Sequence, residues 1–152
     1  MIARNNRCAV FIDQVSVFSS GLILRIEGRL HESEMDRQPI TVEGGAHLAL
    51  RPAVKVRYPD GRTAEVLDHA PPPTATPAGD SHRTEPTLSI RGTYVQGACL
   101  SFSCWLHPLP QHGDLSISVE WQALDLPLHQ WQIREAAIRE SLAKVSDVWD
   151  PN

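Results

Sequence analysis

Apolar and polar residues alternate along several segments of the chain, as they do in β-strands that bury one face and expose the other. Residues 22–31 show this pattern most clearly, because every second position from Leu22 to Leu30 is apolar or glycine. Residues 9–18 are rich in Val, Ile and Phe, and a short Ser-Ser-Gly turn separates the two segments. We therefore predict a β-hairpin over residues 9–31.

Two more hairpins are predicted further along the chain. In residues 54–67 the same alternation surrounds Pro59-Asp60-Gly61, whose residue types favour a tight turn. The third hairpin is predicted to join strands at 99–107 and 115–122 through a proline-rich turn.

The C-terminal end of the chain is predicted to form a helix near 134–149. Apolar residues recur there at helical spacing, at positions Ile138, Leu142, Val145 and Trp149. Further strands are expected at 87–93 and 128–133, and irregular loops near 32–46 and 68–86. The sequence thus predicts a mainly β protein, an antiparallel β-sandwich of about seven to eight strands with one C-terminal amphipathic helix, in a single domain.

The composition excludes several classes of protein. The 152 residues are 41% hydrophobic and 21% charged, which is typical of a globular domain. Lys and Arg number 14 and Asp and Glu 18, a net charge of −4, so nucleic acid is not expected as a partner. No apolar run is long enough for a membrane span or a secretory signal, so no membrane is expected either. The three cysteines fit a reducing compartment, and we expect a cytoplasmic protein.

Several short motifs occur together in this chain. They are Trp105-Leu106-His107-Pro108-Leu109-Pro110, Gly113-Asp114-Leu115, Glu120-Trp121, Leu126-Pro127, Ala136-Ala137 and the turn Asp60-Gly61-Arg62. In these motifs the sequence resembles a group of small uncharacterised actinobacterial proteins with a W-x-x-P-L-P turn, a Glu-Trp strand end and a short C-terminal helix. The resemblance implies a shared fold and a bacterial cytosolic setting, and it brings no activity, substrate or catalytic residue.

Four residues of metal-binding type lie close together in the sequence, namely Cys99, Cys104, His107 and His112. Residues an odd number of positions apart on a strand face opposite sides, so Cys104 diverges from both Cys99 and His107. We therefore predict no metal and no cofactor. The sequence also lacks the nucleophile and glycine-loop motifs of common enzyme families, so no catalytic residue is assigned.

The tryptophans are the strongest candidates for a binding role. Trp121 and Trp149 lie on apolar faces and are expected in the core. Trp105 shares a polar, outward face with His107, and Trp131 lies on the last predicted strand. An outward tryptophan is costly to leave in water, so Trp105 either packs against the C-terminal helix or anchors a ligand or partner.

These patterns favour a non-catalytic intracellular module for protein interaction or scaffolding, with Trp105, His107 and Trp131 as candidate contact residues. The expected partner is another protein, and self-association stays open. The alternative is a β-sandwich that binds a small ligand or carbohydrate on outward tryptophans. The proline-rich segment 68–86 is interpreted as a surface loop, and a recognition loop is the alternative that the sequence leaves open.

Overall fold

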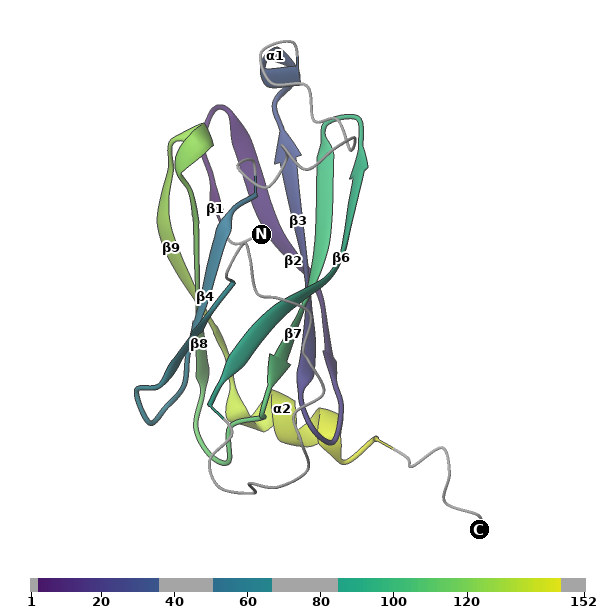
Figure 1. The fold of residues 1–152 in the computed structure, drawn as a ribbon, viewed down its shortest axis with the longest axis vertical. Helices are drawn as coiled ribbons and strands as arrows, with labels where there is room; N and C mark the ends of the chain where they lie inside the picture. The colour runs from purple at the N-terminus through teal and green to yellow at the C-terminus, as the bar shows by residue number, and fades with distance from the viewer. Residues whose placement is uncertain (1–2, 36–50, 67–84, 146–152) are drawn as a thin grey trace.

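The computed structural model describes residues 3–35, 51–66 and 85–145, which form two antiparallel β-sheets packed face to face (Figure 1). In chain order the strands are β1 (Ala3–Arg4), β2 (Cys8–Val17), β3 (Leu22–Leu30), β4 (Ala53–Arg57), β5 (Thr63–Glu65), β6 (Thr87–Gln96), β7 (Cys99–His107), β8 (Leu115–Trp121) and β9 (Leu126–Ile133). The helical elements are α1 (Glu32–Met35), the 3-10 helix η2 (Gln122–Leu124) and α2 (Glu135–Leu142). The prediction of a mainly β sandwich with a C-terminal helix is confirmed.

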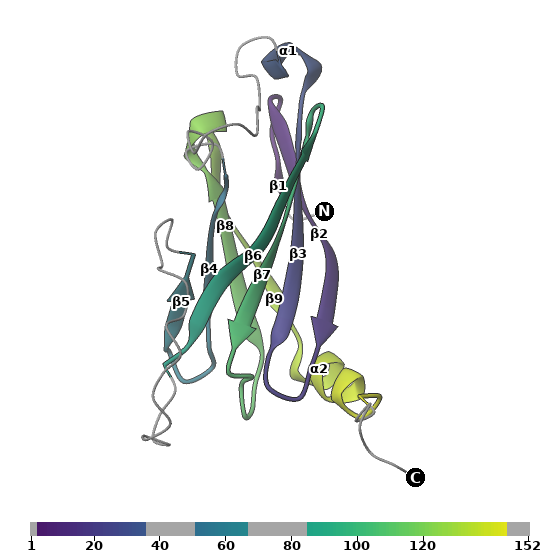
Figure 2. The same ribbon diagram turned by 45° about the vertical axis from the view of Figure 1, so that its right-hand side comes forward.

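Each sheet contains strands from both halves of the chain. The first sheet has the order β1-β2-β3-β7-β6 and the second the order β5-β4-β8-β9. In Figure 2, β4 and β8 lie in one layer while β2 and β3 lie in the other. The first two predicted hairpins are present, since β2 pairs with β3 and β4 pairs with β5.

The core lies between the sheets and is formed by the apolar face of each strand. The alternation predicted for β3 holds, because Leu22, Leu24 and Ile26 are fully buried. Trp121 from the second sheet is 1% exposed, as expected for a core residue, and its ring packs over Gly28 of the first sheet. The second sheet also contributes the fully buried side chains Val56, Leu115, Ile117 and Val119.

The third predicted hairpin is wrong, although both of its strands exist. β7 pairs with β3 and β6 in the first sheet, whereas β8 pairs with β4 and β9 in the second. The connection between β7 and β8 therefore crosses from one sheet to the other. Alternation reports that a strand has one buried face, and it is the same whether the next strand lies beside it or across the core.

The C-terminal helix is shorter than the predicted helix over 134–149. α2 spans Glu135–Leu142, and residues 146–152, which include Trp149, lie outside the described residues. Figures 1 and 2 both place α2 beside the β2–β3 turn, at the lower end of the sandwich. Among the described residues no helix is long and apolar enough to cross a membrane.

The end of α2 follows from what it can bury. Ile138 is buried and Leu142 is partly buried against the core, whereas Val145 is 40% exposed. A short helix depends on tertiary packing for its stability. The helix therefore ends where its apolar face stops contacting the sandwich.

The two predicted loops fall largely outside the described residues. In the segment 32–46, residues 32–35 form the helical turn α1 rather than irregular structure, and the remainder is not described. In the segment 68–86, only Glu85 and Pro86 are described, and Pro86 is buried.

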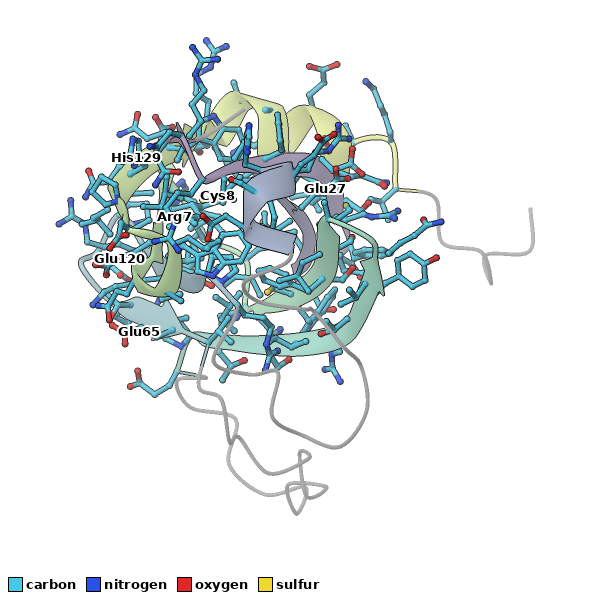
Figure 3. The ribbon with its side chains drawn as sticks, turned by 90° about the horizontal axis from the view of Figure 1, so that it is seen from above. Arg7, Cys8, Glu27, Glu65, Glu120 and His129 are labelled. Carbon is cyan, nitrogen blue, oxygen red and sulfur yellow. The ribbon has the colours of Figure 1, made fainter. Side chains whose placement is uncertain are left out.

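An ion-paired cluster closes the upper end of the sandwich, which Figure 3 shows from above with Arg7 labelled. Glu34 of α1 is 2% exposed, and its carboxylate accepts a 2.7 Å hydrogen bond from Arg7. The same guanidinium forms an ion pair with Asp125, which follows η2. A buried carboxylate needs such a partner, so the pair with Arg7 allows Glu34 to be buried at this end of the sandwich.

Candidate interaction groove

Along one side of the sandwich, no strand pairing among residues 3–35, 51–66 and 85–145 joins the two sheets. β1 pairs only with Ala9 and Val10 of β2, so the rest of β2 is an edge of the first sheet. β9 is an edge of the second sheet. Between these edges lies a groove of about 390 Å³, which we call the β2–β9 groove. It is lined by Val15, Val17, Trp131, Gln132, Ile133, Arg134, Ala137, Ile138 and Ser141.

The groove is apolar because the core faces of both edge strands reach it. Val15 and Val17 lie opposite the fully buried Leu24 and Leu22 in the β2–β3 ladder, which places them on the core face. Both valines are only partly buried. Core-type side chains are therefore accessible on this side of the molecule.

The helix α2 forms one wall of the groove through Ile138, which is 3% exposed. The Glu135 N–H donates to the Asp114 carboxylate at 2.8 Å, and the Gly113 N–H donates to the Glu135 carboxylate at 2.7 Å. The hydrogen bond from Gly113, followed by that from Arg139, holds the pKa of Glu135 below its ordinary value. The connection between β7 and β8 thus fixes the start of α2 and positions this wall.

Trp131 is the largest side chain in the groove. It lies opposite the fully buried Ile117 in the β8–β9 ladder, so it is on the core face of its sheet. It is nevertheless 36% exposed, because no strand of the described residues is hydrogen-bonded to the outer edge of β9. The sequence alone left the facing of Trp131 open; the strand register places it on the core face, and its exposure comes from its position at the sheet edge.

Arg134 is the charged residue in the groove lining. Its side chain makes no hydrogen bond or ion pair within residues 3–35, 51–66 and 85–145, whereas the charged residues of α2 and β2 nearby are paired. These pairs are Glu135 with Arg139, Glu140 with Lys144, and Asp13 with Arg25. Among the described residues, Arg134 therefore contributes a positive charge to the groove that no carboxylate pairs with, in a chain whose net charge is −4.

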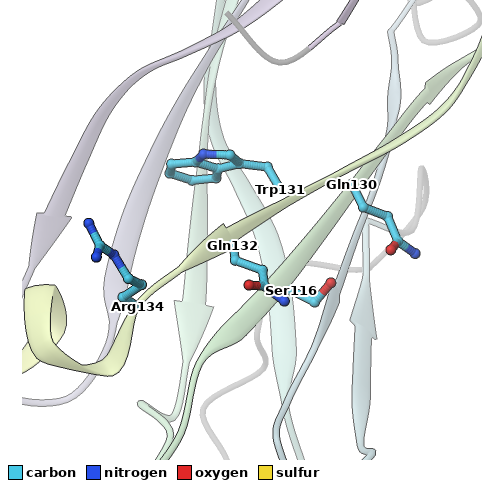
Figure 4. A pocket seen from close by; sticks show the side chains of 5 residues that line it. All are labelled: Ser116, Gln130, Trp131, Gln132 and Arg134. Carbon is cyan, nitrogen blue, oxygen red and sulfur yellow. The ribbon is translucent and has the colours of Figure 1, made fainter.

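A second hollow, of about 460 Å³, lies beside β9 and is shown in Figure 4. It is lined by Ser116, Gln130, Trp131, Gln132 and Arg134. The indole of Trp131 projects from β9 on the side away from Ser116 and Gln130. The indole and the Gln130 amide therefore extend from opposite sides of β9, although Trp131 belongs to the lining of both hollows.

The other two candidate residues, Trp105 and His107, contact the β2–β3 turn. The Trp105 ring lies 5.7 Å from that of Phe18, and a Cβ on Gly21 would be 2.6 Å from it. The His107 Nδ1–H donates to the Ser20 carbonyl at 2.6 Å. Trp105 is thus packed against the turn, while α2 packs against β2. The structure brings these two candidates together and leaves the third in the β2–β9 groove.

The cysteines and histidines do not converge. In the described ranges no group of three or more His, Cys, Asp and Glu side chains could hold a metal ion. Cys104 is fully buried, and burial raises its pKa to about 12, whereas Cys99 is only partly buried. Burial likewise raises the pKa of Cys8 to about 11. All three cysteines are free thiols.

Comparison with known proteins gives a distant structural likeness. No protein-family model and no curated protein sequence matches the chain, so the resemblance to actinobacterial proteins stays a prediction. The archaellum periplasmic stator protein FlaG from Sulfolobus acidocaldarius is similar in structure over 82% of this chain and 99% of that chain. The sequence identity is 12% and the TM-score 0.39, so no functional conclusion is drawn from the likeness.

Proposed function

We propose that this protein is a non-catalytic cytoplasmic interaction module that binds a segment of another protein in the β2–β9 groove. The observation that carries the proposal is Trp131, which is 36% exposed although it lies on the core face of its strand. Aromatic side chains in apolar recesses contribute most of the energy at many protein interfaces. The three free thiols support a reducing compartment.

The lining of the groove favours a protein segment over a polar small molecule. Besides the indole, most of the side chains that line the groove are hydrocarbon, namely Val15, Val17, Ile133, Ala137 and Ile138. A volume of about 390 Å³ accommodates a few side chains. Burial of apolar surface in the groove stabilises a complex by about 25 cal/mol per Å². A ligand with apolar side chains is therefore expected to bind there more tightly than a polar one.

Site-specific photocrosslinking tests where the partner binds. Trp131 is replaced by the photoreactive residue benzoylphenylalanine, the variant is expressed in the native host, and adducts are identified by mass spectrometry. We expect adducts with a defined protein from position 131. The matched controls carry the same residue at Leu128, which is 58% exposed on β9 but outside the groove lining, and at Trp105.

The identified protein must then bind the purified module directly. We expect Trp131→Ala to weaken this binding roughly tenfold or more, as at interface hot spots, and Leu128→Ala to leave it unchanged. Adducts that form equally at the control positions, or that form at no position, count against the groove. So does an affinity that is the same with and without the indole.

The hollow of Figure 4 supports a second candidate function, the binding of a small polar ligand such as a carbohydrate. Ser116, Gln130 and Gln132 offer hydroxyl and amide groups there, and Arg134 offers further donors. A titration of tryptophan fluorescence and NMR shifts with mono- and disaccharides tests this candidate. A saturable response that Gln130→Ala abolishes would support it, and the absence of any response would exclude it.

A further inference from the structure

We infer, on the basis of the proposed function, that the bound segment is an extended strand that pairs antiparallel with the free edge of β9. Alternate side chains of this segment are apolar and enter the β2–β9 groove, and an acidic side chain of the segment pairs with Arg134. The partner is thus another protein with an acidic β-segment of alternating apolar residues. Three features of the described residues lead to this inference.

The first feature is the hydrogen-bonding edge of β9. In an edge strand, alternate residues direct their N–H and C=O groups away from the sheet, and an added strand satisfies them. The β8–β9 ladder is regular over His129–Ile133 and shifts register only beyond this stretch. Pro127, outside it, has no N–H to donate. Every strand pair in this sheet is antiparallel, so the added strand is expected to be antiparallel too.

The opposite edge, β2, is a poorer template for an added strand. The β2–β3 ladder shifts register between Ile12 and Gln14, which leaves Asp13 as the extra residue of a β-bulge. The side chain of Gln14 donates to the Ser16 hydroxyl at 2.9 Å. A bulge disturbs the regular spacing of backbone groups and protects an edge from further pairing. The backbone of the bound segment is therefore expected to pair with β9, while its apolar side chains point into the groove toward β2.

The second feature is the side-chain period of β9. Trp131 and Ile133 both lie on the core face and line the groove. Residues opposite each other in paired strands point to the same face. One in two side chains of the added strand therefore enters the groove between β9 and the valines Val15 and Val17 of β2. Valine and isoleucine suit such a position because they are favoured in strands.

The third feature is the charge of Arg134, which directly follows the end of β9. In an antiparallel pair, the N-terminal end of the added strand lies next to the C-terminal end of β9. An acidic residue near the N-terminus of the segment therefore meets the guanidinium. Because the pair is exposed to solvent, its contribution to affinity is modest, about threefold.

A set of synthetic peptides tests the inference on the whole protein. The parent probe is acetyl-Glu-Val-Thr-Val-Thr-Val-Lys-amide, which alternates apolar and polar side chains behind an N-terminal glutamate. Binding is followed by nitrogen–proton NMR, and the indole signal of Trp131 is assigned from its loss in Trp131→Phe. We expect saturable shifts of this signal and of the backbone amides of His129–Ile133, with millimolar or tighter affinity.

Two peptide series separate backbone pairing from side-chain contact. Methylating alternate backbone nitrogens, in two complementary sets, removes N–H donors and keeps the side chains. One set should weaken binding roughly tenfold, and the other should be tolerated, because only one set faces β9. Replacing the peptide glutamate by glutamine should weaken binding about threefold, and this difference should vanish in Arg134→Gln.

Equal binding of both methylated peptides and the parent would overturn the strand-pairing inference. The absence of Trp131 shifts at about 1 mM parent peptide would also overturn it. Neither result affects the proposed function, which depends on crosslinking at position 131. Conversely, a lack of adducts specific to that position would refute the proposed function even if the peptide binds.

Discussion

Gly28 leaves room for the indole of Trp121, which reaches it from the opposite sheet. A Cβ on residue 28 would lie 2.6 Å from the ring, well inside van der Waals contact. Because Trp121 is 1% exposed and surrounded by core residues, it has little freedom to move away. The indole therefore occupies the space that a side chain at residue 28 would need.

We expect Gly28→Ala to lower the free energy of unfolding by about 1–3 kcal/mol, the usual cost of overpacking a core. Urea denaturation followed by tryptophan fluorescence measures it. Gly92→Ala is the matched control, because Gly92 also lies in a strand of the first sheet and nothing is within 4 Å of a Cβ there. Equal losses for the two variants would contradict the packing of Trp121 on Gly28.

The three thiols are expected to differ in reactivity. Burial raises the pKa of Cys8 to about 11 and that of Cys104 to about 12. Cys99 is partly buried, and burial and the carboxylate of Glu27 raise its pKa as well. The thiolate is the reactive form, and it must also be accessible. Cys99 should therefore react first with Ellman's reagent, and the other two only after unfolding.

Mass spectrometry of the partly labelled protein identifies the modified thiol. Cys99→Ser should abolish the first phase of labelling and leave the others unchanged. Fast labelling of Cys104 in the folded protein would show that β7 is not buried as described.

Among the elements, the stability of α2 depends on the hydrogen bonds of its first turn. The Gly113 N–H donates to the Glu135 carboxylate, and the Glu135 N–H donates to the Asp114 carboxylate. The folded pKa of Glu135 lies below the ordinary value of 4.5, mainly because the Gly113 N–H donates to the carboxylate. At a pH well above 4.5, Glu135 is ionised in both the folded and the unfolded protein, and its hydrogen bonds stabilise the folded state fully. This stabilisation is lost as the pH falls through the folded pKa, since the unfolded state binds the proton more readily.

We therefore expect Glu135→Gln to lower the melting temperature at neutral pH and to make little difference in strong acid. The melting temperatures of Glu135→Gln and of the parent protein are compared by thermal unfolding at several pH values from neutral to strongly acidic. Glu120→Gln, on β8, serves as the control for loss of one carboxylate. A difference for Glu135→Gln that persists unchanged at low pH would contradict the role given to its ionised form.

The sequence shows where strands are, but not which strands are neighbours. Alternation is a property of one segment, and it located β3, β7 and β8 correctly. The connection from His107 to Gly113 suits a hairpin and a crossing between sheets equally well, so the partner of β8 could not be predicted. The end of α2 was also beyond prediction, because it depends on where the sandwich stops and not on the apolar residues of the helix alone.

The same limit applies to the candidate groove. The residue type made Trp131 a candidate, but its facing follows from the β8–β9 register. Its exposure follows from its place on an edge strand of the sheet that the described residues form. Trp105 and His107 share an outward face as predicted, yet the turn residues Ser20 and Gly21 that they contact belong to a distant part of the sequence. A binding site formed at the edges of two sheets cannot be read from either strand alone.

In the whole molecule, the two halves of the chain contribute equivalent parts to both sheets. The first half supplies β1-β2-β3 to one sheet and β4-β5 to the other, and the second half supplies β7-β6 and β8-β9. The halves meet along two seams, β3 with β7 and β4 with β8, and share the core between them. Most of the apolar surface of each half is therefore covered only by the other half.

It follows that the covalent connection between the halves contributes to the stability of the fold mainly by keeping the two halves at a high effective concentration. Fragments 1–75 and 76–152, produced together as separate chains, should co-purify as a one-to-one complex with the β-rich circular dichroism of the intact protein. Either fragment alone should be unfolded or aggregated, and a fragment that folds by itself would disprove this division. Each half of the chain therefore acts as the folding partner of the other, as the two subunits of an obligate heterodimer do.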